Sequence, residues 1–185
     1  MSKTLSSMLP LGTPAPPFTL PDTVSGQTLS LEQLKSDKAT VVMFICNHCP
    51  YVKHVQGELV RLVADYQARG VAFVAISSND AEHYPADAPD KMKLEAETYG
   101  YTFPYLYDQT QSVARAYRAE CTPDFFIFDA ALSLVYRGRM DESTPGNGEP
   151  NDGRDLRAAL DAMLEGKPVA ADQKPSMGCN IKWAR

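Results

Sequence analysis

Cys46 and Cys49 are the residues of this sequence whose types and spacing most directly suggest chemistry. They stand three residues apart in Cys46-Asn47-His48-Cys49, directly after the apolar run 40–45 and before a segment with helical spacing. Residues at i and i+3 of a helix face the same side, so the two sulfurs can form a disulfide. The positive end of a helix favours a thiolate on the nearer sulfur. We therefore predict that Cys46 is a nucleophile with a lowered pKa and that Cys49 resolves its mixed disulfide.

His48 lies between the two cysteines and can favour the thiolate by its charge or by a hydrogen bond. Two other interpretations of the motif stay open. A structural zinc site would need four ligands and could recruit Cys121, Cys179 or a histidine, although the chain has no second close-spaced cysteine pair. The cysteines could also be plain buried residues, but the polar Asn47 and His48 suit a buried strand poorly. We expect no metal and no other cofactor, and we expect His54 to be mainly structural.

The segments around the motif predict an α/β fold. Residues 40–45 and 71–76 are β-branched and apolar runs, typical of strands buried on both faces. The segment between them has helical spacing and ends near Gly70, so strand, helix and strand predict parallel pairing with a right-handed crossover. The other predicted elements are a hairpin of 18–20 and 28–31 around Ser25-Gly26, helices over 91–99 and 112–118, antiparallel strands over 125–128 and 134–136, and a last helix around 156–163 that ends at Gly166.

Length and composition restrict the class of protein. The 185 residues are 44% hydrophobic and 22% charged, which matches one globular domain over 1–185, with a core of residues 10–165 and a C-terminal tail of 166–185 that packs on the body. The net charge is -5 without a Lys/Arg cluster, so we expect no nucleic acid partner. Residues 1–20 hold no apolar run that resembles a signal peptide or membrane span, so we expect a cytoplasmic protein without a membrane partner. Paired thiols in that reducing compartment are more often catalytic or metal-binding than structural.

Three motifs give the chain a resemblance to known proteins. They are Leu11-Gly12-Thr13-Pro14-Ala15-Pro16, the strand that ends in Cys46-Asn47-His48-Cys49-Pro50, and Thr122-Pro123-Asp124-Phe125-Phe126. Residues 10–165 resemble the thioredoxin superfamily, and more closely the redoxin group shared with the alkyl hydroperoxide reductase/thiol-specific antioxidant proteins. The resemblance implies a thioredoxin-like fold, a central mixed β-sheet flanked by helices, with the N-terminal hairpin as an extension. It also implies a cis Pro123 beside the disulfide, which would leave the Thr122 backbone free to pair with an extended substrate. Pro123 could instead simply begin a strand.

The chain is most similar to a group of uncharacterised thioredoxin-like proteins with a Cys-Asn-His-Cys motif, in Cys121-Thr122-Pro123-Asp124 and in the ending 175–183. It departs from the broader patterns at several positions. Ile45 replaces the tryptophan that precedes the first cysteine in thioredoxins, and Thr40 replaces their buried acid, so that His48 or His54 would have to accept the proton. The Pro-x-x-x-Thr/Ser-x-x-Cys peroxidase motif is also absent. Its Pro and Thr positions hold Ala39 and Met43 before Cys46, and Val42 and Cys46 before Cys49.

The sequence therefore predicts a thiol-disulfide oxidoreductase that acts on protein or small-molecule thiols and disulfides, with an unidentified electron donor. The alternative is a peroxiredoxin-like thiol peroxidase with an antioxidant role, which the absent threonine weakens. A third hypothesis is a metal-binding module that uses the thiolates with His48.

Cys121 and Cys179 suggest a second thiol site. Cys121 stands two residues before Pro123 and would lie near the first site if Pro123 abuts the disulfide. Ile181 and Trp183 could anchor the tail and bring Cys179 to Cys121. Alternatively, Cys121 is a small core residue and Trp183 only holds the terminal segment in place.

Overall fold

A central sheet of five strands forms the body of the structure, a computed structural model that describes residues 3–185. Its strands follow the order β6-β5-β4-β8-β9. Neighbours among β4, β5 and β6 are parallel, whereas β8 runs antiparallel to β4 and to β9. The strands are β4 Ala39–Phe44, β5 Val71–Ser77, β6 Tyr105–Tyr107, β8 Asp124–Phe128 and β9 Leu134–Gly138. The predicted mixed sheet is confirmed.

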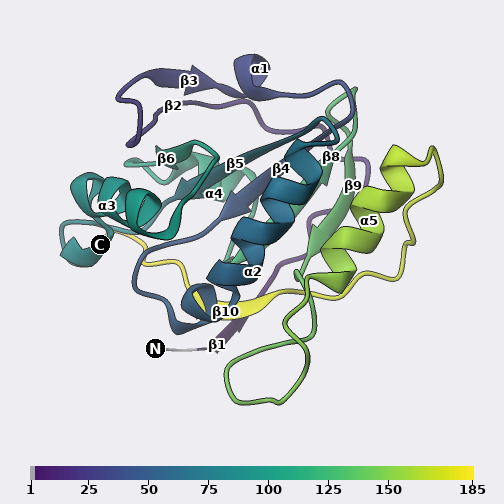
Figure 1. The fold of residues 1–185 in the computed structure, drawn as a ribbon. Coiled ribbons are helices and arrows are strands. Elements are labelled where there is room, and N and C mark those ends of the chain that lie inside the picture. Colours follow the sequence, from purple (N-terminus) through teal and green to yellow (C-terminus); the bar gives the residue numbers. More distant parts are fainter. Residues whose placement is uncertain (1–2) are drawn as a thin grey trace.

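Apolar side chains on both faces of this sheet hold the helices. Along β4, Val41 and Met43 point to one face, Val42 and Phe44 point to the other, and all four are fully buried. The helices α2, α3 and α5 pack on the face of Met43, with α1 and α4 on the opposite face (Figure 1). Their bounds are α1 Leu31–Leu34, α2 Pro50–Gln67, α3 Pro89–Tyr99, α4 Ser112–Ala116 and α5 Arg154–Leu164. The four predicted helices are confirmed, and α1 is additional.

The predicted N-terminal hairpin consists of β2 Thr19–Pro21 and β3 Thr28–Ser30. Gly26 in its turn has a φ of 77°, a conformation that costs glycine least. The strand β3 ends one residue earlier than predicted because Ser30 caps α1. Its hydroxyl accepts the Gln33 N–H, and the Gln33 side chain accepts the Ser30 N–H, which forms a capping box.

A second sheet joins segments from far apart in the sequence. It consists of β1 Lys3–Leu5, β10 Met177–Asn180 and β7 Cys121–Thr122. The strand β10 lies in the middle and is antiparallel to both neighbours, with Cys179 opposite Thr122. In Figure 1, β10 crosses near the N-terminal end of α2 with β1 beside it. The sequence predicted a packed tail here but no strand, because four residues around a glycine carry no clear strand pattern.

Gly178 allows β10 to approach β7 at close range. A Cβ atom at this position would lie 1.8 Å from the Thr122 carbonyl oxygen. We expect Gly178→Ala to displace β10 or to destabilise the fold by about 1–3 kcal/mol, the usual cost of overpacking. Amide hydrogen exchange of residues 177–180 should accelerate. The matched control is Gly57→Ala, since Gly57 lies in α2 and the nearest atom to its added Cβ, on the Arg61 side chain, is 3.9 Å away. Equal protection of β10 in the parent and in Gly178→Ala would contradict this packing argument.

Candidate active site

The Cys46-Asn47-His48-Cys49 segment connects β4 to α2. The strand ends at Phe44, and Cys49 is the N-cap residue of the helix, whose first residue is Pro50. Proline is tolerated at this position because its missing N–H would have no helical partner. The helix therefore begins after the second cysteine, and its unpaired N–H groups face Cys49 more closely than Cys46. The sequence also predicted a helix after the cysteines, but it took Cys46 as the sulfur nearer to the helix terminus.

Cys49 lies at the centre of a group of sulfur atoms. Its Sγ is 2.7 Å from the Sγ of Cys179 and 3.5 Å from the carbonyl oxygen of Thr122. A hydrogen bond from Cys46 lowers the pKa of the Cys49 thiol to about 5 against the opposing effect of burial, with further contributions from Cys179 and the Val52 N–H. A thiolate at Cys49 is thus stabilised by two thiols and by the end of a helix.

Cys46 has the opposite electrostatic environment. It is 1% exposed, and its Sγ lies 3.4 Å from the Thr122 hydroxyl. Its hydrogen bond to Cys49, its burial and the nearby negative charge of Asp87 raise the pKa of Cys46 well above its ordinary value. These effects favour the negative charge on Cys49, whereas the sequence predicted the lowered pKa for Cys46. The N–H groups at the helix terminus stabilise a negative charge on Cys49, while Cys46 faces the carboxylate of Asp87. The sequence did not predict this carboxylate.

Asp87 supplies this carboxylate from the short 3-10 helix η1, Pro85–Asp87. It is fully buried and accepts hydrogen bonds from the Asn47 N–H at 2.8 Å and from the Asn79 side chain at 2.9 Å. Burial alone would raise its pKa, but hydrogen bonds from His48, Asn79 and Asn47 outweigh burial and hold the pKa of Asp87 below its ordinary value. Asp87 is therefore a fixed negative charge beside the cysteines. The polar stretch 77–90 contains no motif from which the role of Asp87 could be predicted.

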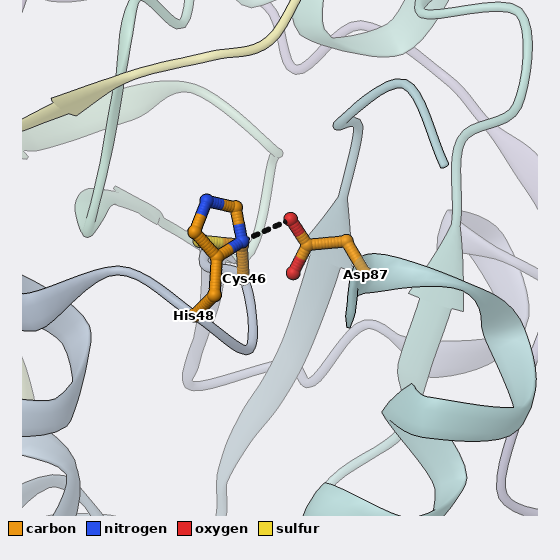
Figure 2. A group of neighbouring side chains, drawn as sticks. All are labelled: Cys46, His48 and Asp87. Carbon is orange, nitrogen blue, oxygen red and sulfur yellow. Dashed lines mark ion pairs between the residues drawn. The ribbon is translucent and has the colours of Figure 1, made fainter. Parts of the chain in front are cut away.

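His48 faces Asp87 from the motif itself. Its Nδ1 is 2.5 Å from Asp87 Oδ2 (Figure 2), and its ring stacks on Tyr84 with centroids 6.0 Å apart. The ligand atoms of Cys46, His48 and Asp87 all lie within 4.8 Å of one another. His48 can thus take part in proton transfer near Cys46. His54, in contrast, bonds the Ser143 hydroxyl at 2.5 Å and does not belong to this group of ligand atoms.

Thr122 and Pro123 complete the site from the opposite side. The Thr122-Pro123 peptide bond is cis, as the family resemblance implied. Thr122 contacts Cys46 through its hydroxyl and Cys49 through its carbonyl oxygen. The resemblance also implied that the Thr122 backbone is free to pair with a substrate. Here that edge is already occupied, because β10 pairs with it through Cys179.

The structure gives Cys179 a different neighbour from the one that the sequence suggested. Cys179 lies opposite Thr122 and contacts Cys49, whereas Cys121 lies opposite Asn180. Successive side chains on a strand point to opposite faces, so Cys179 and Cys121 are directed apart. Cys121 is fully buried, with its sulfur 3.9 Å from the carbonyl oxygens of Pro123 and Ser176. Burial raises its pKa, and burial with the hydrogen bond to Cys49 raises that of Cys179 to about 12.

Comparison with known proteins identifies the family of this chain. Residues 11–137 match the model of the AhpC/TSA family. The chain belongs to the AhpC/TSA family. Membership supports a redox function. No curated protein matches the chain closely enough to count as a relative. Among residues 3–185, no helix is long and apolar enough to cross a membrane.

Solved structures similar to this AhpC/TSA family member include two of high identity. One is an uncharacterized conserved protein from Geobacillus kaustophilus, with 62% identity and a TM-score of 0.98 over 100% of this chain and 97% of that one. Another is a hypothetical protein from Sinorhizobium meliloti, with 48% identity and a TM-score of 0.95 over 98% of each chain. A thiol:disulfide interchange protein of the thioredoxin family from Chlorobium tepidum has 22% identity and a TM-score of 0.64, covering 83% of this chain and 97% of its own. The fold is thus thioredoxin-like, as predicted.

The assignment of the thiolate can be tested by titration. As the pH rises through about 5, the ultraviolet thiolate absorbance of the reduced protein should increase by one thiolate, since the folded protein lowers the pKa of Cys49 from 9.0 to that value. The Cys49→Ser variant should lose this step. The Cys121→Ser variant should keep it, because Cys121 is a buried thiol whose pKa is raised. Loss of the step in Cys46→Ser together with its survival in Cys49→Ser would place the thiolate on Cys46.

Proposed function

We propose that this protein is a thiol-disulfide oxidoreductase that exchanges disulfides through Cys46 and Cys49. The observation that carries the proposal is the contact of both sulfurs with Thr122, the residue before the cis proline, at the N-terminus of α2. One sulfur is stabilised as a thiolate and the other is held as a thiol beside it. A nucleophile and a resolving thiol in contact are what dithiol exchange requires.

The electrostatics favour Cys49 as the attacking sulfur. Its thiolate attacks one sulfur of a substrate disulfide, the substrate S–S bond breaks, and the other substrate sulfur leaves as a thiolate that takes up a proton. Cys46 then loses its proton to the neighbouring His48–Asp87 pair, whose ligand atoms lie within 4.8 Å of its sulfur. The Cys46 thiolate attacks Cys49, the Cys46–Cys49 disulfide forms, and the second substrate sulfur leaves. Two electrons pass to the substrate, and an external thiol donor restores the dithiol.

The substrates in this proposal are protein or small-molecule disulfides, and the donor is a thiol reductant. The net charge of -5 argues against nucleic acid as a partner. A cytoplasmic location and the absence of a membrane partner remain predictions from the sequence.

Peroxide reduction is less well supported, although the family name includes antioxidant proteins. The peroxidase motif would require a hydroxyl side chain at position 43. Met43 is an apolar residue in β4 and is fully buried, so its side chain offers no hydrogen-bond donor to a peroxide. We expect peroxide turnover by the reduced protein to stay at the rate of a simple thiol.

Substitution of each cysteine tests the proposed roles. In a disulfide reduction assay with insulin and dithiothreitol, Cys49→Ser should reduce the rate to that of dithiothreitol alone, because the attacking thiolate is lost. The Cys46→Ser/Cys179→Ser double variant should also lose turnover, since no thiol remains beside Cys49 to resolve its first mixed disulfide. The control is Cys121→Ser, which removes a buried thiol outside the pair and should keep the parent rate. Parent activity in Cys49→Ser or in the Cys46→Ser/Cys179→Ser double variant would exclude the pair from the mechanism.

A metal-binding role is a second candidate because the atoms of Cys46, His48 and Asp87 in Figure 2 converge within 4.8 Å. Thiolate, imidazole and carboxylate are the ligand types that suit zinc. Metal analysis of protein purified without chelator tests this role. Stoichiometric zinc that is lost in Asp87→Asn and retained in Cys121→Ser would support it. We expect less than stoichiometric metal, because the same sulfur is required for disulfide exchange.

A further inference from the structure

The strand β10 occupies the edge of β7 as an added peptide strand would. Cys179 pairs with Thr122 in antiparallel register, and Gly178 passes so close to the Thr122 carbonyl oxygen that no side chain fits there. Extended peptides that bind sheet edges use the same arrangement, with backbone hydrogen bonds for affinity and alternate side chains for specificity. Here the side chain directed at the active site is a cysteine.

The segments on both sides of Cys179 are held in place. Before it, the Ser176 N–H donates to the Ser6 hydroxyl at 2.8 Å, and the Ser176 hydroxyl donates to the Pro123 carbonyl oxygen. After it, the Lys182 N–H donates to the Asn79 side chain at 2.9 Å, and the Lys182 carbonyl oxygen accepts the Asp80 N–H at 2.8 Å. The position of Cys179 is therefore set by contacts outside the sulfur group.

The segment that follows β10 is anchored by apolar and cationic contacts as well. Ile181 is 1% exposed and belongs to the core on the α4 side of the sheet. The Trp183 ring lies 4.3 Å below the Arg115 guanidinium, a cation–π contact. Cys179 itself is only 2% exposed. The tail thus presents its thiol to the interior of the molecule rather than to solvent.

Cys49 lies between two thiols in this arrangement. It accepts a hydrogen bond from Cys46, and its Sγ is 2.7 Å from that of Cys179. This distance is only slightly longer than the roughly 2.05 Å of a disulfide bond, so a small shift of β10 or of the helix terminus would allow bonding. The carbonyl contacts of Cys121 direct it elsewhere.

We infer that Cys179 is a third redox cysteine, which can replace Cys46 as the disulfide partner of Cys49. This inference rests on the proposed function. In the oxidised protein, Cys179 loses its proton and its thiolate attacks Cys49 Sγ of the Cys46–Cys49 disulfide. The Cys49–Cys179 bond forms, the Cys46–Cys49 bond breaks, and Cys46 leaves as a thiolate that takes up one proton. One disulfide is exchanged for another, so no oxidant or reductant is consumed. The product ties β10 to α2 across the edge of β7 and leaves Cys46 as the free thiol.

Oxidation of the Cys46→Ser variant with oxidised glutathione tests this inference. Cys49 would first form a glutathione adduct, and Cys179 would then displace the glutathione. Peptide mapping should show a Cys49–Cys179 disulfide and one remaining free thiol, that of Cys121. The Cys46→Ser/Cys121→Ser double variant should give the same disulfide. The Cys46→Ser/Cys179→Ser double variant should instead retain glutathione on Cys49.

The results that would contradict this inference differ from those that would contradict the proposed function. A stable Cys49 glutathione adduct with a free Cys179 thiol in Cys46→Ser would overturn the inference. The Cys46–Cys49 disulfide in oxidised Cys179→Ser reports on the proposed pair alone, so its absence would count against the proposed function. Gly178→Ala in the Cys46→Ser background should lower the yield of the Cys49–Cys179 disulfide, because the added Cβ displaces the strand that carries Cys179. An unchanged yield would contradict the role assigned to β10.

Discussion

The pairing of Thr122 with Cys179 is the interaction on which the arrangement of the active site depends. Thr122 contacts both cysteines of the motif on one side and β10 on the other. The strand β7 has only two residues, so its backbone groups have few alternatives to this pairing. Displacement of β10 would free the backbone of Thr122 and uncover Cys49 in the same movement. Binding of an extended substrate at this edge would therefore compete with the pairing of β10.

Burial gives the charges in the site their effect. Cys46, Cys49 and Asp87 are all within 1% of complete burial, so water screens their interactions only weakly. The carboxylate of Asp87 disfavours a second negative charge on Cys46, while the thiol of Cys46 stabilises the charge on Cys49 by a hydrogen bond. Both effects favour the proton on Cys46 and the negative charge on Cys49. His48 links that carboxylate to the motif through the contact of its Nδ1 with Asp87 Oδ2.

A second buried carboxyl connects the small sheet to the central one. Asp124 begins β8 directly after Pro123, and one of its oxygens accepts a hydrogen bond from Ser6 at 2.9 Å. Burial raises its pKa to about 8. The folded protein thus holds Asp124 largely protonated at neutral pH. The stability associated with that proton is fully present below the ordinary pKa of 3.8 and is lost as the pH rises from there through about 8. Ionisation of Asp124 places a negative charge where the N-terminal segment that supports β10 is attached.

Local spacing determined what the sequence alone could predict. The continuous apolar run of β4 and the helical spacing of α2 placed Cys46 and Cys49 together at a strand-to-helix turn, because both are properties of neighbouring residues. The cis Pro123 followed from a family resemblance. Only the tertiary structure decided that Asp87 faces Cys46 and that the Val52 N–H at the helix terminus bonds Cys49, which favours the negative charge on Cys49 rather than on Cys46. Only the tertiary structure likewise brought Cys179 to Cys49, 130 positions apart, because the register of β10 on β7 determines which face each cysteine presents.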